Sequence, residues 1–160
     1  MTRNAVVAGI AVVAALLLGY GSTTGPRRFD ATGDGYPGTA TSLAQILGQF
    51  ATSVVAAICL GALVYILSTA VPDEHGRLDA DTYRVHLLLM RAAPVWALLA
   101  AGMAVVDAAA RSAAPATQLL TSPALFDAIA ATETARGWCA TTLCAAIVAV
   151  GVRFTVRWTG

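Results

Sequence analysis

The sequence predicts an all-α membrane protein with four transmembrane helices and a short helix at the membrane surface. Apolar residues (A, V, I, L, M, F, W, Y and C) make up 58% of the 160 residues, whereas charged residues make up only 12%. A soluble domain carries about 25% charged residues, which cover its water-facing surface. The apolar residues gather in stretches close to the roughly 20 residues that a transmembrane helix needs. We therefore expect spans at about 4–20, 48–71, 84–108 and 136–156.

The charged residues indicate which partners to expect, and the cysteines indicate whether disulfides are expected. All ten basic residues are arginines, the net charge is +1, and the sequence contains no basic patch of the kind that binds nucleic acid. We expect the partners to be the lipid bilayer and other membrane helices or membrane-protein subunits. The cysteines, Cys59, Cys139 and Cys144, lie inside apolar stretches, so the sequence predicts no disulfide framework.

The first span is expected at 4–20, with Arg3 before it. Small residues follow it, and Gly19 and Gly21 match the small-x-small pattern of a signal-peptide cleavage site. Between a cleaved signal peptide and a retained helix, we favour the retained helix. The segment 21–41 is rich in Gly, Pro, Thr and Asp, which predicts a loop on the outer side of the membrane.

The second helix is expected to begin near Ser42, because Ser42 and Gln45 match the capping-box pattern at a helix N-terminus. Its apolar part continues to the end of the 48–71 span. Small residues recur at four-residue spacing within it, at Ser53, Ala57 and Gly61. Small residues let two helix backbones approach closely, so we expect this face to pack on another helix.

The third span, 84–108, contains Arg91 and Pro94. Pro94 removes one backbone N–H and clashes with the preceding turn, so we expect a kink there. Arg91 lies about 9 Å along the helix axis from the start of the apolar stretch, by the rise per residue. It is either a gating, anion-binding or structural residue in the bundle interior, or an arginine that reaches back to the inner membrane surface.

Asp107 and Arg111 lie four residues apart near the outer end of the third helix, a spacing that allows an ion pair. We interpret them as polar residues with a structural or gating role. After them, Ser122 and Pro123 resemble an N-cap followed by proline at the first helical position. The sequence therefore predicts a short helix over 123–131 that lies at the membrane surface.

The last span is expected at 136–156, with Arg153 and Arg157 at its inner end. Arginines are enriched on the cytoplasmic side of membrane proteins. With Arg3 at the other end of the chain, this pattern places both termini in the cytoplasm. We accordingly expect a multi-pass protein of the cytoplasmic membrane.

Soft metal ligands are scattered through the spans. His86 and Met90 lie four residues apart on one helix face, and Met favours reduced copper. Cys59 and Cys144, on different helices, offer two thiolates at similar expected depth. The alternative for each Met and Cys is a packing role in the core. No nucleophile–base pair, phosphate loop or carboxylate pair is present in the sequence, so we do not expect an enzyme.

Several short motifs give the chain a family resemblance. They are Tyr36-Pro37-Gly38, Gly61, Arg91 with Trp96, Val106-Asp107-Ala108-Ala109, and Thr132-Glu133-Thr134-Ala135-Arg136-Gly137-Trp138. With these motifs the chain resembles the N-terminal membrane part of actinobacterial copper resistance D proteins. Those proteins fuse a CopD-like membrane domain to a cytochrome c oxidase assembly domain of the CtaG type.

The resemblance implies copper handling in the cytoplasmic membrane: copper uptake or resistance, or copper supply for assembly of the terminal oxidase. Copper would then be the bound ion. The competing expectation is a non-transporting membrane scaffold or an accessory subunit of a respiratory complex. Proteins of the resembled kind are much longer than this chain, which would correspond to their first four spans, so a third expectation is a helical fragment without a function of its own.

Overall fold

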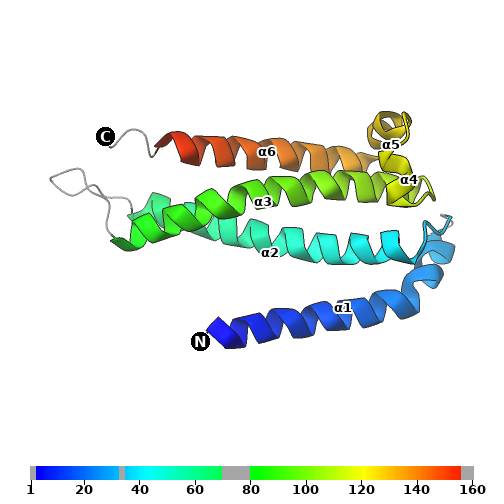
Figure 1. Ribbon diagram of the computed structural model, residues 1–160, viewed down its shortest axis with the longest axis horizontal. Coiled ribbons are helices and arrows are strands. Elements are labelled where there is room, and N and C mark those ends of the chain that lie inside the picture. Colours follow the sequence, from blue (N-terminus) through cyan, green and yellow to red (C-terminus); the bar gives the residue numbers. More distant parts are fainter. Residues whose placement is uncertain (1–2, 33–34, 70–79, 156–160) are drawn as a thin grey trace. The chain divides into compact units, whose positions relative to one another are not determined.

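The computed structural model describes residues 3–32, 35–69 and 80–155, and every regular element in these ranges is an α-helix. The helices are α1 (Arg3–Thr32), α2 (Thr39–Thr69), α3 (Ala80–Arg111), α4 (Ala116–Leu120), α5 (Leu125–Ala131) and α6 (Glu133–Thr155) (Figure 1). The predicted all-α fold is confirmed. No strand occurs in the described ranges, and α1, α2, α3 and α6 are far longer than α4 and α5.

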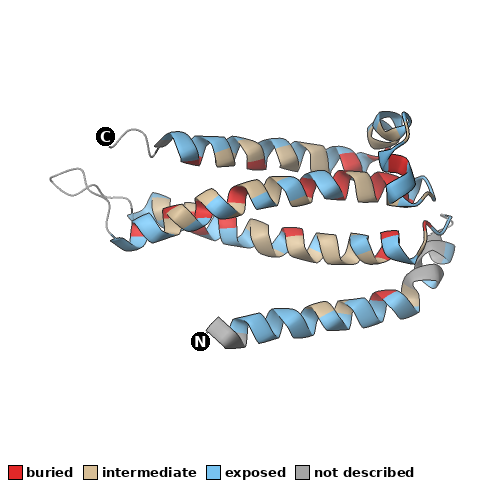
Figure 2. Ribbon diagram, viewed as in Figure 1, coloured by how far each residue is buried: buried red, intermediate tan, exposed pale blue. Residues whose placement is uncertain are grey.

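Four helices are long and apolar enough to cross a membrane. The candidate spans are Val6–Thr24, Thr39–Thr69, Ala80–Arg111 and Glu133–Phe154, with mean hydropathies of 2.0, 2.3, 1.7 and 1.6. Within the single chain only 6%, 17%, 28% and 11% of these spans are buried (Figure 2). Apolar surface of this extent suits hydrocarbon rather than water, so these are the helices of a lipid-embedded protein.

The contacts divide the chain into two compact units. The first unit comprises residues 1–50 and 102–137, and the second comprises residues 51–101 and 138–160. Helices α2, α3 and α6 each contribute residues to both units.

In the first unit, the start of α2 packs against the end of α3, and the short helices close over the same end. The buried core consists of Ala108, Ala109, Leu119 and Ala135, and Leu125 and Ile129 of α5 pack against it. Small alanines let the backbones of α3 and α6 approach closely. The backbone N–H of Ala116 donates a 3.2 Å hydrogen bond to Oγ1 of Thr41, which ties α4 to the start of α2.

In the second unit, α2, α3 and α6 share one core. Its buried residues are Cys59, Ala62, Leu89, Ala93 and Val152. The hydroxyl oxygens of Thr69 and Thr82 lie 3.4 Å apart, which brings the end of α2 to the start of α3. The two helices are therefore antiparallel neighbours in this unit.

The predicted outer loop over 21–41 is wrong for residues 21–32, because α1 continues to Thr32. The hydroxyls of Ser22, Thr23 and Thr24 donate hydrogen bonds to the carbonyls of Gly19 and Tyr20, three or four residues earlier in the same helix. Hydroxyl groups that bond back in this way are compatible with helix, although their residue types favour loops. Of the described residues in the predicted loop, 35–38 are non-helical.

The predicted capping box is also wrong. Helix α2 begins at Thr39, one turn before the predicted start, and the backbone N–H of Ser42 donates to the carbonyl of Gly38 at 3.1 Å. Gly38 has a φ of +96°, a left-handed conformation that glycine adopts without strain, and this conformation sets the earlier start. Gln45, the expected partner of Ser42, instead reaches across to α3.

The helix predicted over 123–131 is observed as α5, which begins two residues later, at Leu125. The hydroxyl of Ser122 accepts a 3.2 Å hydrogen bond from the N–H of Ala124 within a turn, so Ser122 does cap backbone, but in the turn that precedes the helix. A second short helix, α4, precedes this turn and was not predicted. The location of α5 at the membrane surface stays a prediction.

Candidate functional site

The buried face of α3 carries the most informative side chains. Most of its buried positions follow one another at spacings of three, four or seven residues, at Thr82, His86, Leu89, Ala93, Ala100, Met103 and Asp107. This repeat is the pattern of a helix that packs against neighbours along one side. Two of the buried residues, His86 and Asp107, are titratable. In a membrane protein, ionisable side chains that face the interior of the helix bundle mark candidate functional sites.

His86 is 9% exposed, and its Nε2 atom is buried without a hydrogen-bond partner among the described residues. A buried polar atom without a partner costs about 1–3 kcal/mol. Such an atom calls for an explanation, and one explanation is that it binds an ion. Imidazole nitrogen is also a common ligand for copper.

Two sulfur side chains lie in the same core. Cys59 is fully buried in the core of the second unit, and Met90, one helical turn after His86, packs against that core. Counted from the Thr69–Thr82 contact, Cys59 lies about 15 Å along the helices, Met90 about 12 Å and His86 about 6 Å, at 1.5 Å per residue. The two sulfurs are thus at nearly the same level, and His86 is one turn away.

Cys144 does not join this group. Its side chain is exposed, whereas Cys59 is fully buried, and the expectation that the two thiols lie at similar depth stays a prediction. The sequence placed both in apolar spans but could not show which faces of the helices were buried. In the described part of the chain, no three His, Cys, Asp or Glu side chains are grouped to hold a metal ion. A metal site in this core would therefore need the sulfur of Met90.

A second polar contact crosses between α2 and α3 in the first unit. Nε2 of Gln45 donates a 2.9 Å hydrogen bond to Oδ1 of Asp107, which is 8% exposed. The bond satisfies part of the hydrogen-bonding capacity of a buried carboxyl group. This contact was not predicted, because the capping-box pattern indicated a helix cap as the place of Gln45. The predicted pairing of Asp107 with Arg111 stays a prediction.

Arg91 is exposed on the surface of α3. This position rules out the alternative in which its guanidinium lies in the interior of the described bundle. It agrees with the alternative in which the side chain extends toward the membrane surface. Pro94 lies within the continuous α3 helix, and the predicted kink stays a prediction.

The predicted packing face of α2 is wrong within the described chain. Ser53, Ala57 and Gly61 are all exposed, and a Cβ atom added to Gly61 would meet nothing within 4 Å. The close approach occurs at Gly48 instead, where an added Cβ would clash with Sδ of Met103 on α3. A run of small residues shows where another helix could approach, but it does not show which face of an apolar helix is covered.

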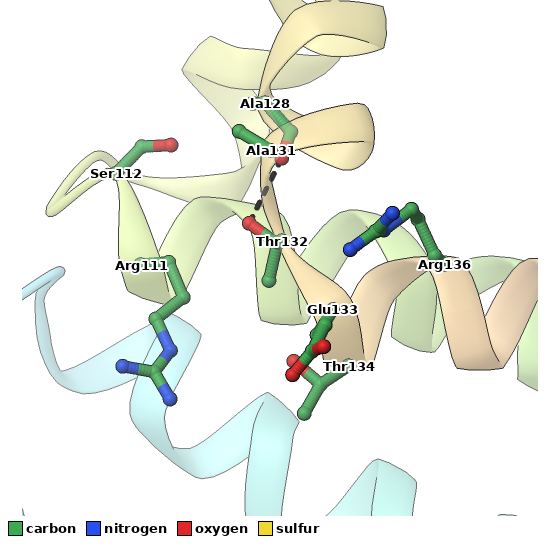
Figure 3. Close-up of a pocket in the computed structure, with 8 residues that line it drawn as sticks. All are labelled: Arg111, Ser112, Ala128, Ala131, Thr132, Glu133, Thr134 and Arg136. Carbon is green, nitrogen blue, oxygen red and sulfur yellow. Dashed lines mark hydrogen bonds between the residues drawn. The ribbon is translucent and has the colours of Figure 1, made fainter.

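A polar hollow lies at the end of the first unit where α3 ends and α6 begins (Figure 3). Its volume is about 620 Å³. The lining residues are Arg111, Ser112, Ala128, Ala131, Thr132, Glu133, Thr134 and Arg136. Arg111 was expected to be polar and structural, whereas the role of Arg136 as a lining residue was not predicted.

The chain matches uncharacterized mycobacterial proteins along its whole length. It is 41% identical over 160 residues to the uncharacterized protein Mb0105 of Mycobacterium bovis and, equally, to the uncharacterized protein MT0111 of Mycobacterium tuberculosis. It is 36% identical over 152 residues, 95% of the chain, to the uncharacterized protein ML1998 of Mycobacterium leprae. No family model matches the chain, and no solved structure matches it.

These relatives are much longer than the present sequence. The chain spans about a quarter of their length, 24% of the first two and 23% of the third. The four candidate spans therefore correspond to one part of each relative.

Proposed function

We propose that this chain is a membrane domain that handles copper, and that it binds the reduced ion through His86, Met90 and Cys59. The observation that carries the proposal is the buried Nε2 atom of His86, which has no hydrogen-bond partner in the described part of the chain. The nearby sulfur of Met90 and the buried thiol of Cys59 supply the soft donors that Cu(I) prefers. The resemblance to copper resistance D proteins supports the same choice of ion.

The arrangement of the three donors suits passage of an ion better than permanent storage. They are spread over about 9 Å of helix axis, by the rise per residue, so one ion would contact two of them at a time. Weak binding at neighbouring sites lets an ion enter and leave, as conduction requires. The ion is thus the cargo of the domain, and the proposed role is not catalytic.

The proposal includes a location. The domain would lie in the cytoplasmic membrane with both termini in the cytoplasm, as the arginine pattern predicts. Its cargo would serve copper uptake or resistance, or the supply of copper for assembly of the terminal oxidase.

Copper binding by the purified protein in detergent tests the proposal. We expect the wild-type protein to bind about one equivalent of Cu(I), and the His86→Ala/Met90→Ala double variant to lose at least about tenfold in affinity, because each missing donor removes metal–ligand bonding. Cys59→Ser is expected to weaken binding as well. Calorimetric titration of the protein with Cu(I) in the absence of oxygen measures these affinities.

Cys144→Ser is the matched control, since it removes a thiol that is exposed on α6. Its affinity for Cu(I) should equal that of the wild type. A wild-type protein that shows no saturable binding of Cu(I), or a double variant that binds Cu(I) as tightly as the wild type, would show that this core is not a copper site.

A scaffold or accessory role is the second candidate, and a specific observation favours it. The Val6–Thr24 span is only 6% buried within the chain, and the small-residue face of α2 is exposed. Helices with so little internal packing have surface available for other membrane subunits. Metal-free protein that co-purifies with oxidase subunits from membranes would support this candidate over copper handling.

A further inference from the structure

The hollow at the end of the first unit brings together positive charge from two separate helices. Arg111 belongs to the last turn of α3, and Arg136 belongs to the first turn of α6. Figure 3 shows the two guanidinium groups on opposite sides of the hollow, with Glu133 between them. The charged side chains that line it therefore sum to a net positive charge. Guanidinium groups bind phosphate through paired, charge-assisted hydrogen bonds.

Residues that line the hollow are held in place by burial and by hydrogen bonds. Thr132 is 8% exposed, and Ala128 packs against the buried core of the first unit. The hydroxyls of Ser112 and Thr132 are already committed, because each donates a 2.8 Å hydrogen bond to a backbone carbonyl, of Ala108 and Ala128 respectively. Arg111 also has an interaction of its own. A guanidinium carries five N–H donors, so it can hold a ligand beside another partner.

The N-terminus of helix α6 borders the hollow through Glu133 and Thr134. The backbone N–H of Arg136 is bonded to the carbonyl of Thr132, which marks Thr132 as the residue before the helix. The N–H groups of Glu133, Thr134 and Ala135 belong to the first turn of the helix, where N–H groups have no carbonyl acceptor within the helix. These groups and the positive end of the helix dipole favour a negative ligand, in addition to the two arginines.

The hollow lies at the ends of two candidate spans. The candidate span of α3 ends at Arg111, and that of α6 begins at Glu133. By the length and apolarity of these spans we expect the hollow near the lipid–water boundary. Phosphate groups are concentrated at this depth in the lipid headgroup layer, and soluble phosphates reach it from the water.

We propose that this hollow binds a phosphate group, held by Arg111 and Arg136 at the N-terminus of α6. Glu133 opposes the bound anion and limits its affinity. The phosphate belongs either to a lipid headgroup or to a soluble phosphate, and both would be recognised by the same donors. The site is independent of the copper site proposed in the second unit.

Binding measurements on the purified protein in an uncharged maltoside detergent test the proposal. Inorganic phosphate is titrated by calorimetry, and phosphatidylglycerol is added and detected as a bound adduct by native mass spectrometry. Diacylglycerol, which lacks the phosphate, is the negative ligand control. We expect saturable binding of at least one phosphate-bearing probe and no binding of diacylglycerol.

Three variants relate the binding to this hollow. Arg136→Gln should lower the affinity at least about tenfold, because it removes a charge-assisted pair of hydrogen bonds. Glu133→Gln should raise the affinity, because it removes the opposing charge. Arg153→Gln is the matched control, since it changes an exposed arginine in the last turn of the same helix, and it should leave the affinity unchanged.

The outcomes also separate the two sources of phosphate. Adducts of phosphatidylglycerol that persist in excess inorganic phosphate identify a lipid site, whereas displacement of the lipid identifies a site for soluble phosphate. Two outcomes overturn the proposal: neither probe binds saturably, or Arg136→Gln and Glu133→Gln both bind as the wild type does. Because Glu133→Gln is expected to strengthen binding, its result cannot be mistaken for a loss of folding.

Discussion

Gln45 on α2 and Asp107 on α3 are joined by a 2.9 Å hydrogen bond, from Nε2 of the amide to Oδ1 of the carboxyl group. Asp107 is 8% exposed, and it lies on the same buried face of α3 as Met103. A carboxyl group in this environment depends on its donors, because the surrounding hydrocarbon offers none. The contact therefore fixes the position of the two helices next to each other in the first unit.

Replacing Gln45 with Leu should destabilise the protein by about 1–3 kcal/mol, since it leaves part of a buried carboxyl group without its donor. The measurement is the thermal unfolding of the detergent-solubilised protein, followed by circular dichroism. Gln118→Leu serves as a control, because Gln118 is an exposed glutamine on α4.

A double variant tests whether the loss of stability comes from this hydrogen bond. Gln45→Leu/Asp107→Leu removes both polar groups, so it should be more stable than Gln45→Leu alone. If Gln45→Leu melts with the wild type, the hydrogen bond contributes nothing to the helix pair.

Gly48 and Gly61 provide a matched pair of glycines on one helix. A Cβ atom at Gly48 would clash with Sδ of Met103, whereas a Cβ atom at Gly61 would meet no atom within 4 Å. Gly48→Ala should therefore destabilise the protein, by about 1–3 kcal/mol for an overpacked contact. Gly61→Ala should be neutral or stabilising, by up to about 1 kcal/mol from helix propensity.

Thermal melts of the two single variants and of Gly48→Ala/Met103→Ala check this prediction. The second substitution removes the sulfur that the new methyl group would meet, so the effect of Gly48→Ala should be much smaller in the Met103→Ala background. A non-additive cycle of this kind is the signature of direct contact. Equal losses from Gly48→Ala and Gly61→Ala would contradict the observed packing.

The sequence alone was sufficient to predict the number and approximate position of the long helices. The reason is physical, because the length and the apolarity of a span are properties of the chain itself and do not depend on its neighbours. The end of α1 was missed because Ser22, Thr23 and Thr24 are residues of both loops and helices. Their side-chain bonds to earlier carbonyls exist only once the helix has formed.

The faces of the helices could not be predicted in the same way. In a soluble helix the polar residues mark the outside, but in α2 and α3 both the lipid-facing and the core-facing sides are apolar. Gly61 and Gly48 are therefore indistinguishable in the sequence, although Gly48 alone makes the close contact. For the same reason, the burial of His86 and of Cys59, and the exposure of Cys144, emerge only from the structure.

Four membrane crossings have a consequence for the two sides of the bilayer. The start of α1 and the end of α6 should lie on one side, and the segment 112–132 that bears the polar hollow should lie on the other. Single cysteines at Arg3 and Ser112 should thus react from opposite sides with a membrane-impermeant maleimide. The background for both variants is the protein with Cys59, Cys139 and Cys144 changed to alanine.

With both termini in the cytoplasm, Ser112→Cys should be labelled in intact cells, and Arg3→Cys only after the membrane is permeabilised. Labelling of Arg3→Cys alone in intact cells would keep the four crossings but reverse the orientation proposed from the arginines. Labelling of both cysteines in intact cells would contradict the three crossings expected between residue 3 and residue 112, because an odd number of crossings places these two residues on opposite sides. The reaction of the cysteine-free background measures the non-specific signal, and the Cys variants must retain the thermal melt of that background for their labelling to report on the native topology.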